Sequence, residues 1–250
     1  MTRAVLQDEI ERLGPRFHDL DLDGVRTAPD HPLGPFLEEI WRSVESAFPE
    51  DMRGTTVLDI GCNAGFYALK LTDRGADVMG VDRDARYLAQ ARFAAEVRGV
   101  DLELEQMDVY DVDRLGRQFD YVLFMGVLYH LRHPLYGLEK AAGRARERLV
   151  FQTMVRGADD VFEPQADYPI DERRVFEERG FPAMYFVEHR YAGDQTNWWI
   201  PNDAGAAAML RSVGLRIEAH PGPGIYVCAP LGGPSGERTR HEAVQAGGAA

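Results

Sequence analysis

Cysteine, lysine and long apolar runs are scarce in this chain of 250 residues. Its cysteines are Cys62 and Cys228 alone, too few for a disulfide framework and without the spacing of a metal site. No apolar run approaches the roughly 20 residues that span a bilayer, and charged residues stand where a secretory signal needs its apolar core. We therefore expect a cytoplasmic protein without a membrane partner.

Positive charge is also in short supply. Lysine and arginine together number 28 against 41 aspartates and glutamates, which gives a net charge of −13, and the lysines are only Lys70 and Lys140. Proteins that bind nucleic acids usually present a basic face. The balance argues against a nucleic-acid partner without excluding one, and it favours a small-molecule substrate. It leaves the oligomeric state open.

One familiar nucleotide-binding pattern is missing. The stretch from Val57 to Phe66 reads V-L-D-I-G-C-N-A-G-F, a buried strand that flows into a glycine turn. The dinucleotide fingerprint G-x-G-x-x-G would need glycine where Asn63 and Phe66 stand, so NAD and FAD are disfavoured. Gly61 and Gly65 still allow a tight turn and a close approach of the backbone to a ligand.

Two further predicted strands end in acids. Asp82 closes the strand from Val78 and falls 17 residues after Gly65, where a ribose-binding carboxylate is expected in a βαβ unit. Asp108 follows a strand over 102–107 and is suited to the amino group of an adenine. With Asp59 at the first strand, three successive strand ends carry an acid. Any single acid is equally well explained as a helix cap, but the set predicts a nucleoside cofactor.

The motif D-x-G-x-x-x-G that begins at Asp59 resembles the first motif of class I S-adenosylmethionine (SAM)-dependent methyltransferases. Residues 119–135, F-D-Y-V-L-F-M-G-V-L-Y-H-L-R-H-P-L, closely resemble a signature of the tRNA wobble-uridine carboxymethyltransferases and their methyltransferase relatives. The resemblance is strong over 59–150 and returns weakly over 197–214. The chain departs from the family at Asn63, where glycine is common, which narrows the room beside a ligand.

This resemblance implies SAM as cofactor and a doubly wound, Rossmann-like α/β sheet of strand order 3-2-1-4-5-7-6. It also implies N-terminal helices and an insertion after the fifth strand. The residues that it assigns to the cofactor are Asp59, Gly61, Cys62, Asn63, Gly65, Phe66, Asp82, Arg83, Asp108, Val109, Met125 and Gly126.

The pattern along the chain predicts a single methyltransferase domain over 1–230. Within it, 1–52 form a helical cap, with a helix over 3–13, a loop from Phe17 to Pro35 and a second helix from Pro35. Another helix is expected from Pro134 to near Arg148, a fifth strand over 148–155, and an antiparallel hairpin of 215–220 with 225–229. The last residues, 231–250, have too little apolar content to fold and are expected to be disordered.

The segment 156–200 is long for a connection in a compact domain, and its aromatic content argues against disorder. An insertion after the fifth strand would overhang the ligand site of such a sheet. We therefore interpret it as a substrate lid, with an ordinary satellite core as the alternative. The residues expected to face substrate are His189, Arg190, Tyr191, Trp198 and Trp199.

Tyr129 and His130 follow the fourth strand and are the predicted catalytic residues. SAM already carries an electrophilic methyl group, so the protein must align a nucleophile and remove its proton. His130 suits a general base at neutral pH, and Glu188 and His189 are alternative bases. Although His130 and His133 form H-x-x-H, Pro134 breaks the local geometry, and no metal is expected.

Three functions stay open at this point. The leading hypothesis is a SAM-dependent methyltransferase that modifies an oxygen or nitrogen of a small-molecule or sugar-like substrate. The second is a tRNA wobble-uridine alkyltransferase that uses carboxy-SAM or SAM. The third is a non-catalytic SAM-binding protein.

Overall fold

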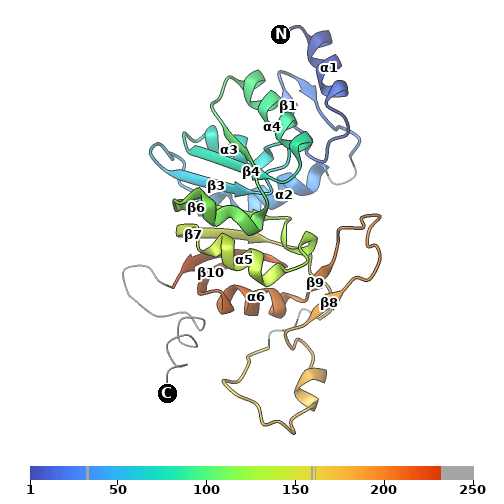
Figure 1. Cartoon of the computed structure of the whole chain (residues 1–250), viewed down its shortest axis with the longest axis vertical. Coiled ribbons are helices and arrows are strands. Elements are labelled where there is room, and N and C mark those ends of the chain that lie inside the picture. The colour runs from blue at the N-terminus through green and yellow to red at the C-terminus, as the bar shows by residue number, and fades with distance from the viewer. Residues whose placement is uncertain (32–33, 159, 161, 232–250) are drawn as a thin grey trace. The chain divides into compact units, whose positions relative to one another are not determined.

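The computed structural model describes residues 1–31, 34–158, 160 and 162–231 (Figure 1). The predicted disordered tail lies, from residue 232 on, outside the described residues. The helices are α1 (Arg3–Arg12), α2 (Gly34–Val44), α3 (Phe66–Thr72), α4 (Ala85–Arg98), α5 (Pro134–Ala142) and α6 (Asp203–Ser212). The 3-10 helices are η1 (Glu45–Ala47), η2 (Val109–Leu115), η3 (Leu128–His130) and η4 (Arg174–Glu177).

Short strand pairs and one large sheet make up the β-structure. The strands are β1 (Asp21–Leu22), β2 (Val25–Arg26), β3 (Thr56–Ile60), β4 (Asp77–Asp82), β5 (Glu103–Gln106), β6 (Phe119–Met125), β7 (Ala145–Gln152), β8 (Met184–Phe186), β9 (Trp199–Pro201), β10 (Leu215–Gly222) and β11 (Ile225–Pro230). The large sheet has seven strands in the order β10-β11-β7-β6-β3-β4-β5. Strands β3, β4 and β5 pair in parallel, whereas β10, β11 and β7 pair antiparallel. The predicted α/β class with a Rossmann-like sheet is confirmed.

The chain forms two compact units, and the boundary between them falls inside β6, after Leu123. The first unit holds the glycine turn and the acids that follow β3, β4 and β5. The second holds the residues after β6, the insertion and the terminal hairpin.

The N-terminal part of the first unit contains more regular structure than expected. Both predicted helices are present, and α1 buries Leu6 and Ile10. The loop expected from Phe17 to Pro35, however, contains the hairpin of β1 and β2. Its turn places Asp23 and Gly24 at positive φ, a conformation that Asp tolerates and Gly prefers, so the prediction of a plain loop was wrong there.

The boundary between α5 and β7 also differs from the prediction. The helix that begins at Pro134 ends at Ala142, and Gly143 follows it, so the expected end near Arg148 was wrong. Arg148 lies inside β7, which runs over Ala145–Gln152 and not over 148–155. The charged first half of this strand is largely exposed, and its run of Arg and Glu looks like a solvent-facing helical turn in sequence. The predicted terminal hairpin is confirmed as β10 with β11.

The insertion over 156–200 has an ordered core of its own. Strands β8 and β9 pair antiparallel, and Tyr191 bridges to Asp194. The ring of Phe181 contacts the rings of Phe162 and Phe176, each at a centroid distance of 5.1 Å. Phe176 is 68% exposed and the other two rings are half-buried, so the substrate lid and the satellite core both stay predictions.

Candidate functional site

The glycine turn after β3 adopts three left-handed residues. Gly61, Asn63 and Gly65 have φ values of 72°, 50° and 84°. Asn is one of the few side-chain-bearing residues that enters this region readily, because its short amide can bond locally. The Asn63 Oδ1 accepts the Ala64 N–H at 2.7 Å. The departure from the family's glycine at this position therefore keeps the backbone conformation that the turn needs.

Asp82, the last residue of β4, is hydrogen-bonded to the glycine turn. Its Oδ2 accepts the backbone N–H of Asn63 at 3.0 Å, and its Oδ1 accepts that of Asp84 at 2.8 Å. Burial raises the pKa of Asp82, and the two backbone hydrogen bonds act against this rise. A carboxylate has about four lone-pair sites, so these bonds leave acceptor capacity for a diol. Arg83 is exposed, and its carbonyl accepts the side-chain amide of Gln106.

Asp59 and Cys62 lie inside the first unit. Asp59 is 2% exposed, and within the described residues its Oδ2 has no hydrogen-bond partner. Burial, followed by the charge of Asp82, raises the pKa of Asp59 to about 7. Cys62 is equally buried, and a Cβ added to Gly80 would lie 2.9 Å from its Sγ. Both predicted residues thus support the turn from the interior, whereas Asp82 is half-buried at its rim.

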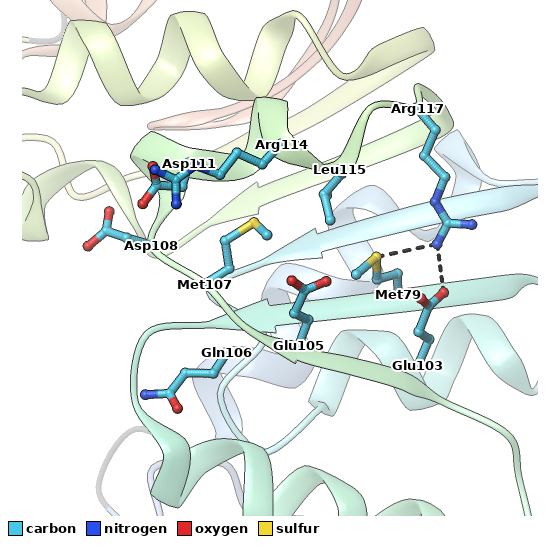
Figure 2. Close-up of a pocket in the computed structure, with 10 residues that line it drawn as sticks. All are labelled: Met79, Glu103, Glu105, Gln106, Met107, Asp108, Asp111, Arg114, Leu115 and Arg117. Atoms are coloured by element: carbon cyan, nitrogen blue, oxygen red, sulfur yellow. Dashed lines mark hydrogen bonds and ion pairs between the residues drawn. The ribbon is translucent and has the colours of Figure 1, made fainter.

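Asp108 follows β5 and caps η2, since its Oδ1 accepts the Tyr110 N–H at 3.1 Å. The next residue, Val109, is buried. Beside Asp108 lies a cavity of about 450 Å³ between β5 and η2. Figure 2 shows the carboxylate of Asp108 at one end of this cavity and Arg117 at the other, where Arg117 donates to Glu103 at 2.6 Å. Of the predicted cofactor residues only Asp108 lines this cavity, so it is distinct from the glycine turn.

His18 is a functional candidate that the sequence did not single out. It is buried, and its Nδ1 accepts the backbone N–H of Phe66 at 3.2 Å, at the first residue of α3. Burial, with a smaller effect of His31, lowers the pKa of His18 to about 3. The imidazole is therefore neutral and holds the N-terminal segment against the end of the glycine turn.

In the second unit, Met125 and Gly126 lead from β6 into the predicted catalytic residues. Gly126 has φ of 74°, and a Cβ there would lie 3.3 Å from the Tyr129 Oη. Burial, followed by the charge of Asp194, raises the pKa of Tyr129 to about 12. The phenol is thus a protonated hydrogen-bond donor at neutral pH.

His130 is part of a relay with two residues of the insertion. Its Nδ1 lies 2.8 Å from the Thr196 Oγ1 and 3.9 Å from the Asp194 Oδ2. The Thr196 hydroxyl donates in turn to the Asp194 Oδ1 at 2.7 Å. Asp194 and Thr196 were not predicted as site residues. The sequence signal that could have indicated them was a pair of polar residues within an aromatic segment. Nothing in the sequence links this pair to His130, which precedes Thr196 by 66 residues.

The predicted substrate residues separate into two groups. Trp198 and Trp199 are both half-buried. Both contact Arg132: its guanidinium lies 4.2 Å from the Trp198 ring centroid, and its carbonyl accepts the Trp199 Nε1–H at 3.4 Å. The Trp198 N–H also donates to the Tyr129 carbonyl at 2.7 Å. These contacts bring the tryptophan pair to η3 and its histidine.

The other group points to solvent or pairs elsewhere. The His189 side chain is 86% exposed and lies 3.7 Å from Glu188, and Arg190 is exposed as well. The Tyr191 hydroxyl accepts a hydrogen bond from the Arg156 Nε at 2.7 Å.

The described residues contain no group of three His, Cys, Asp or Glu side chains arranged to hold a metal ion. They also contain no helix with the length and apolar character needed to cross a membrane.

Residues 57–149 match a family model described as a methyltransferase domain. The chain is 28% identical over 225 residues to the tRNA U34 carboxymethyltransferase of Azotobacter vinelandii, covering 86% of this chain and 60% of that protein. It is 30% identical over 202 residues to the same enzyme of Pseudomonas aeruginosa, covering 76% and 55%. The chain therefore spans little more than half the length of these curated relatives.

Among solved structures, the chain is similar to the N-terminal domain of EvdMO1 with SAH bound. The TM-score is 0.65 at 23% identity, and the match covers 92% of this chain and 97% of that one. A second structure of that domain was determined in the presence of SAH and D-fucose. At this level of identity the likeness is one of fold.

Proposed function

This chain carries a class I SAM-dependent methyltransferase domain, and we propose that it methylates an oxygen or nitrogen of a small-molecule or sugar-like acceptor. The observation that carries the proposal is the relay of His130, Thr196 and Asp194. When bound, SAM supplies a sulfonium methyl group that is already electrophilic, so the protein's task is to orient the acceptor and take its proton.

The first unit fits the cofactor. The left-handed turn at Gly61, Asn63 and Gly65 exposes backbone without a Cβ at its two glycines. Asp82 would accept hydrogen bonds from a vicinal diol, and Asp108 would accept from an amino group. The buried Asp59, with one carboxylate oxygen unpartnered among the described residues, would hold the turn from behind.

The relay defines which nitrogen of His130 is basic. The Thr196 hydroxyl has one proton, and it donates that proton to the Asp194 carboxylate. The Nδ1 of His130 must then be the donor to the Thr196 oxygen, which leaves Nε2 as the unprotonated nitrogen. A proton taken up at Nε2 would be stabilised by the negative charge of Asp194 near the ring. This is the arrangement expected of a general base oriented by a second residue.

The side chains near the relay, Tyr129, Trp198 and Trp199, favour a small molecule as the acceptor. Tyr129 stays protonated and can donate a hydrogen bond to an acceptor oxygen. The half-buried rings of Trp198 and Trp199, which both contact Arg132, combine apolar and polar groups as small-molecule sites commonly do. His189 is too exposed to serve as a preorganised base.

A tRNA acceptor is the second candidate, because the relatives at 28 and 30% identity are named tRNA U34 carboxymethyltransferases. The charge weighs against it, because a net charge of −13 offers little to a phosphate backbone. A SAM-binding protein without catalysis is the third candidate, and the relay argues against it.

The test is an acceptor screen with relay variants. The purified protein would be incubated with SAM or carboxy-SAM and either unmodified tRNA or a panel of sugars and small hydroxyl compounds that includes D-fucose. Products would be followed by mass spectrometry. We expect methylation in the small-molecule arm, and modified nucleosides would instead establish the tRNA function.

With an acceptor in hand, His130→Ala should lower kcat about 100-fold or more, as is usual for loss of a general base. Asp194→Asn and Thr196→Val should lower kcat by smaller factors, because they only orient the ring. SAH affinity, measured by calorimetry, should stay within about twofold in all three. His189→Ala is the matched control and should keep parental turnover. If His189→Ala loses turnover and His130→Ala keeps it, the general base is His189 of the insertion and not His130.

A further inference from the structure

Arg16 is a buried cation without a hydrogen-bonded partner. The residue is 6% exposed, and among the described residues none accepts a hydrogen bond from its Nε, Nη1 or Nη2. Burial lowers its pKa, with a weaker opposing effect of Glu9. An ionised group that is buried without compensation costs several kcal/mol, so such groups are normally paired. A guanidinium that stays charged in this position calls for an anion.

The chain around Arg16 is fixed on both sides. The Gln90 Nε2 of α4 donates to the carbonyls of Leu13 and Pro15 at 3.0 and 3.1 Å. Two residues after Arg16, His18 accepts the N–H of Phe66 at the end of the glycine turn. Arg16 therefore lies in a segment that contacts both α4 and the first residue of α3. That residue directly follows the turn predicted to bind the cofactor.

The acids nearby do not supply the missing charge. Glu9 bonds to Arg12, through its Oε2 at 2.7 Å from the Arg12 Nε, and its charge acts on Arg16 only at longer range. Arg26, another cation of this N-terminal segment, pairs with Asp19. Arg16 thus differs from both arginines in having no carboxylate within hydrogen-bond reach in the described part of the chain.

We propose that Arg16 binds the carboxylate at the amino-acid end of SAM. This inference rests on the cofactor assignment and extends it to a residue outside every predicted site. Arginine suits the task because its planar guanidinium binds a carboxylate through two parallel hydrogen bonds. Each cofactor molecule has one such carboxylate, and Arg16 is a buried guanidinium without a hydrogen-bonded partner among the described residues.

The test compares two ligands that differ at this end. SAH retains the amino-acid group, whereas 5′-methylthioadenosine keeps the adenosine and the sulfur without it. By calorimetry, Arg16→Met should weaken SAH at least 10-fold and leave methylthioadenosine within about twofold. Arg12→Met, an exposed arginine of the same segment, should change neither. Equal effects on the two ligands, or no effect on SAH, would overturn the proposal. Failure of the parent to bind either ligand would refute the cofactor assignment itself.

Thermal unfolding without ligand gives a second readout. Removing an uncompensated buried charge should leave the Tm of apo Arg16→Met equal to or above that of the parent, while its rise on adding SAH shrinks. A lower apo Tm, matched by Glu9→Gln, would show that Arg16 serves as a structural partner of Glu9 and overturn the proposal.

Two further measurements complete the test. Arg16→Lys keeps the charge without the paired hydrogen bonds and should bind SAH with intermediate affinity, which covers the case that Arg16→Met fails to fold. A loss of carboxy-SAM binding in Arg16→Met with SAH binding unchanged would assign Arg16 to a different carboxylate and refute the proposal as stated.

Discussion

Replacing Asp59 by Asn should change how the stability of this protein depends on pH. In the folded state the pKa of Asp59 is about 7, against an ordinary value of 3.8. Between these values the folded protein holds a proton that the unfolded chain has released. The contribution of Asp59 to stability is therefore complete below pH 3.8 and is lost as the pH rises towards 7.

His18 acts in the opposite direction. Its pKa falls to about 3 from 6.5 on folding. Between those values the unfolded chain holds the extra proton, so this contribution is complete above pH 6.5 and is lost as the pH falls towards 3. Each group alone changes the free energy of unfolding by about 1.4 kcal/mol per pH unit. From pH 4.5 to 6 the two slopes nearly cancel in the parent.

Substituting one of the two residues should reveal the pH dependence of the free energy of unfolding that the other one causes. Relative to the parent, Asp59→Asn should gain about 2 kcal/mol between pH 4.5 and 6, and His18→Gln should lose a similar amount. Gln keeps an acceptor for the Phe66 N–H without a titrating ring. The assay is urea unfolding at four pH values with linear extrapolation, which resolves differences of this size. The double variant is the control and should run parallel to the parent.

A curve for Asp59→Asn that stays parallel to the parental one would refute this reasoning. It would mean that Asp59 is already ionised in the fold and paired in a way that the geometry does not show. A slope of the expected size but of opposite sign would mean that folding lowers the pKa of Asp59 instead of raising it.

Two more predictions concern the same turn. Asp82→Ala should weaken SAH by about 2 to 4 kcal/mol in a calorimetric titration, because hydrogen bonds to charged groups contribute roughly 1.5 to 3 each. An affinity within threefold of the parent would reduce Asp82 to an acceptor for the N–H groups of Asn63 and Asp84. Gly80→Ala should destabilise the fold by about 1 to 3 kcal/mol in urea, because its Cβ would meet the Cys62 Sγ at 2.9 Å. Combining it with Cys62→Ala should recover part of that loss, and the absence of any recovery would place the clash elsewhere.

The sequence was a good guide where the signal is local. Buried apolar runs followed by glycine or an acid predicted β3, β4 and the glycine turn after β3. The prediction worked because strand burial and turn formation depend on residues that are adjacent in sequence. The same reasoning was weaker at β7, whose exposed first half has a composition shared by helices and strands. It assigned Arg146 and Glu147 to a helix when they begin a strand.

Contacts between distant segments could not be predicted in this way. His18 meets Phe66 across 48 residues, and His130 meets Thr196 across 66. Nothing in either segment alone marks its partner, since the pairing is decided by how the chain folds around the sheet. Arg16 shows the same limit: its sequence neighbours give it the appearance of a surface arginine, and only the packing reveals that it is buried.

The edge strand β5 of the large sheet bears on how two copies of the chain could pair. Strand β5 is the last in the sheet order and exposes Glu103 and Glu105. An uncovered edge strand presents unpaired backbone groups to which another chain can add. A second copy docking there would have to bring its own acids against these ones. Glu103 and Glu105 would therefore place like charges opposite each other in such a pairing, and both also line the cavity beside Asp108.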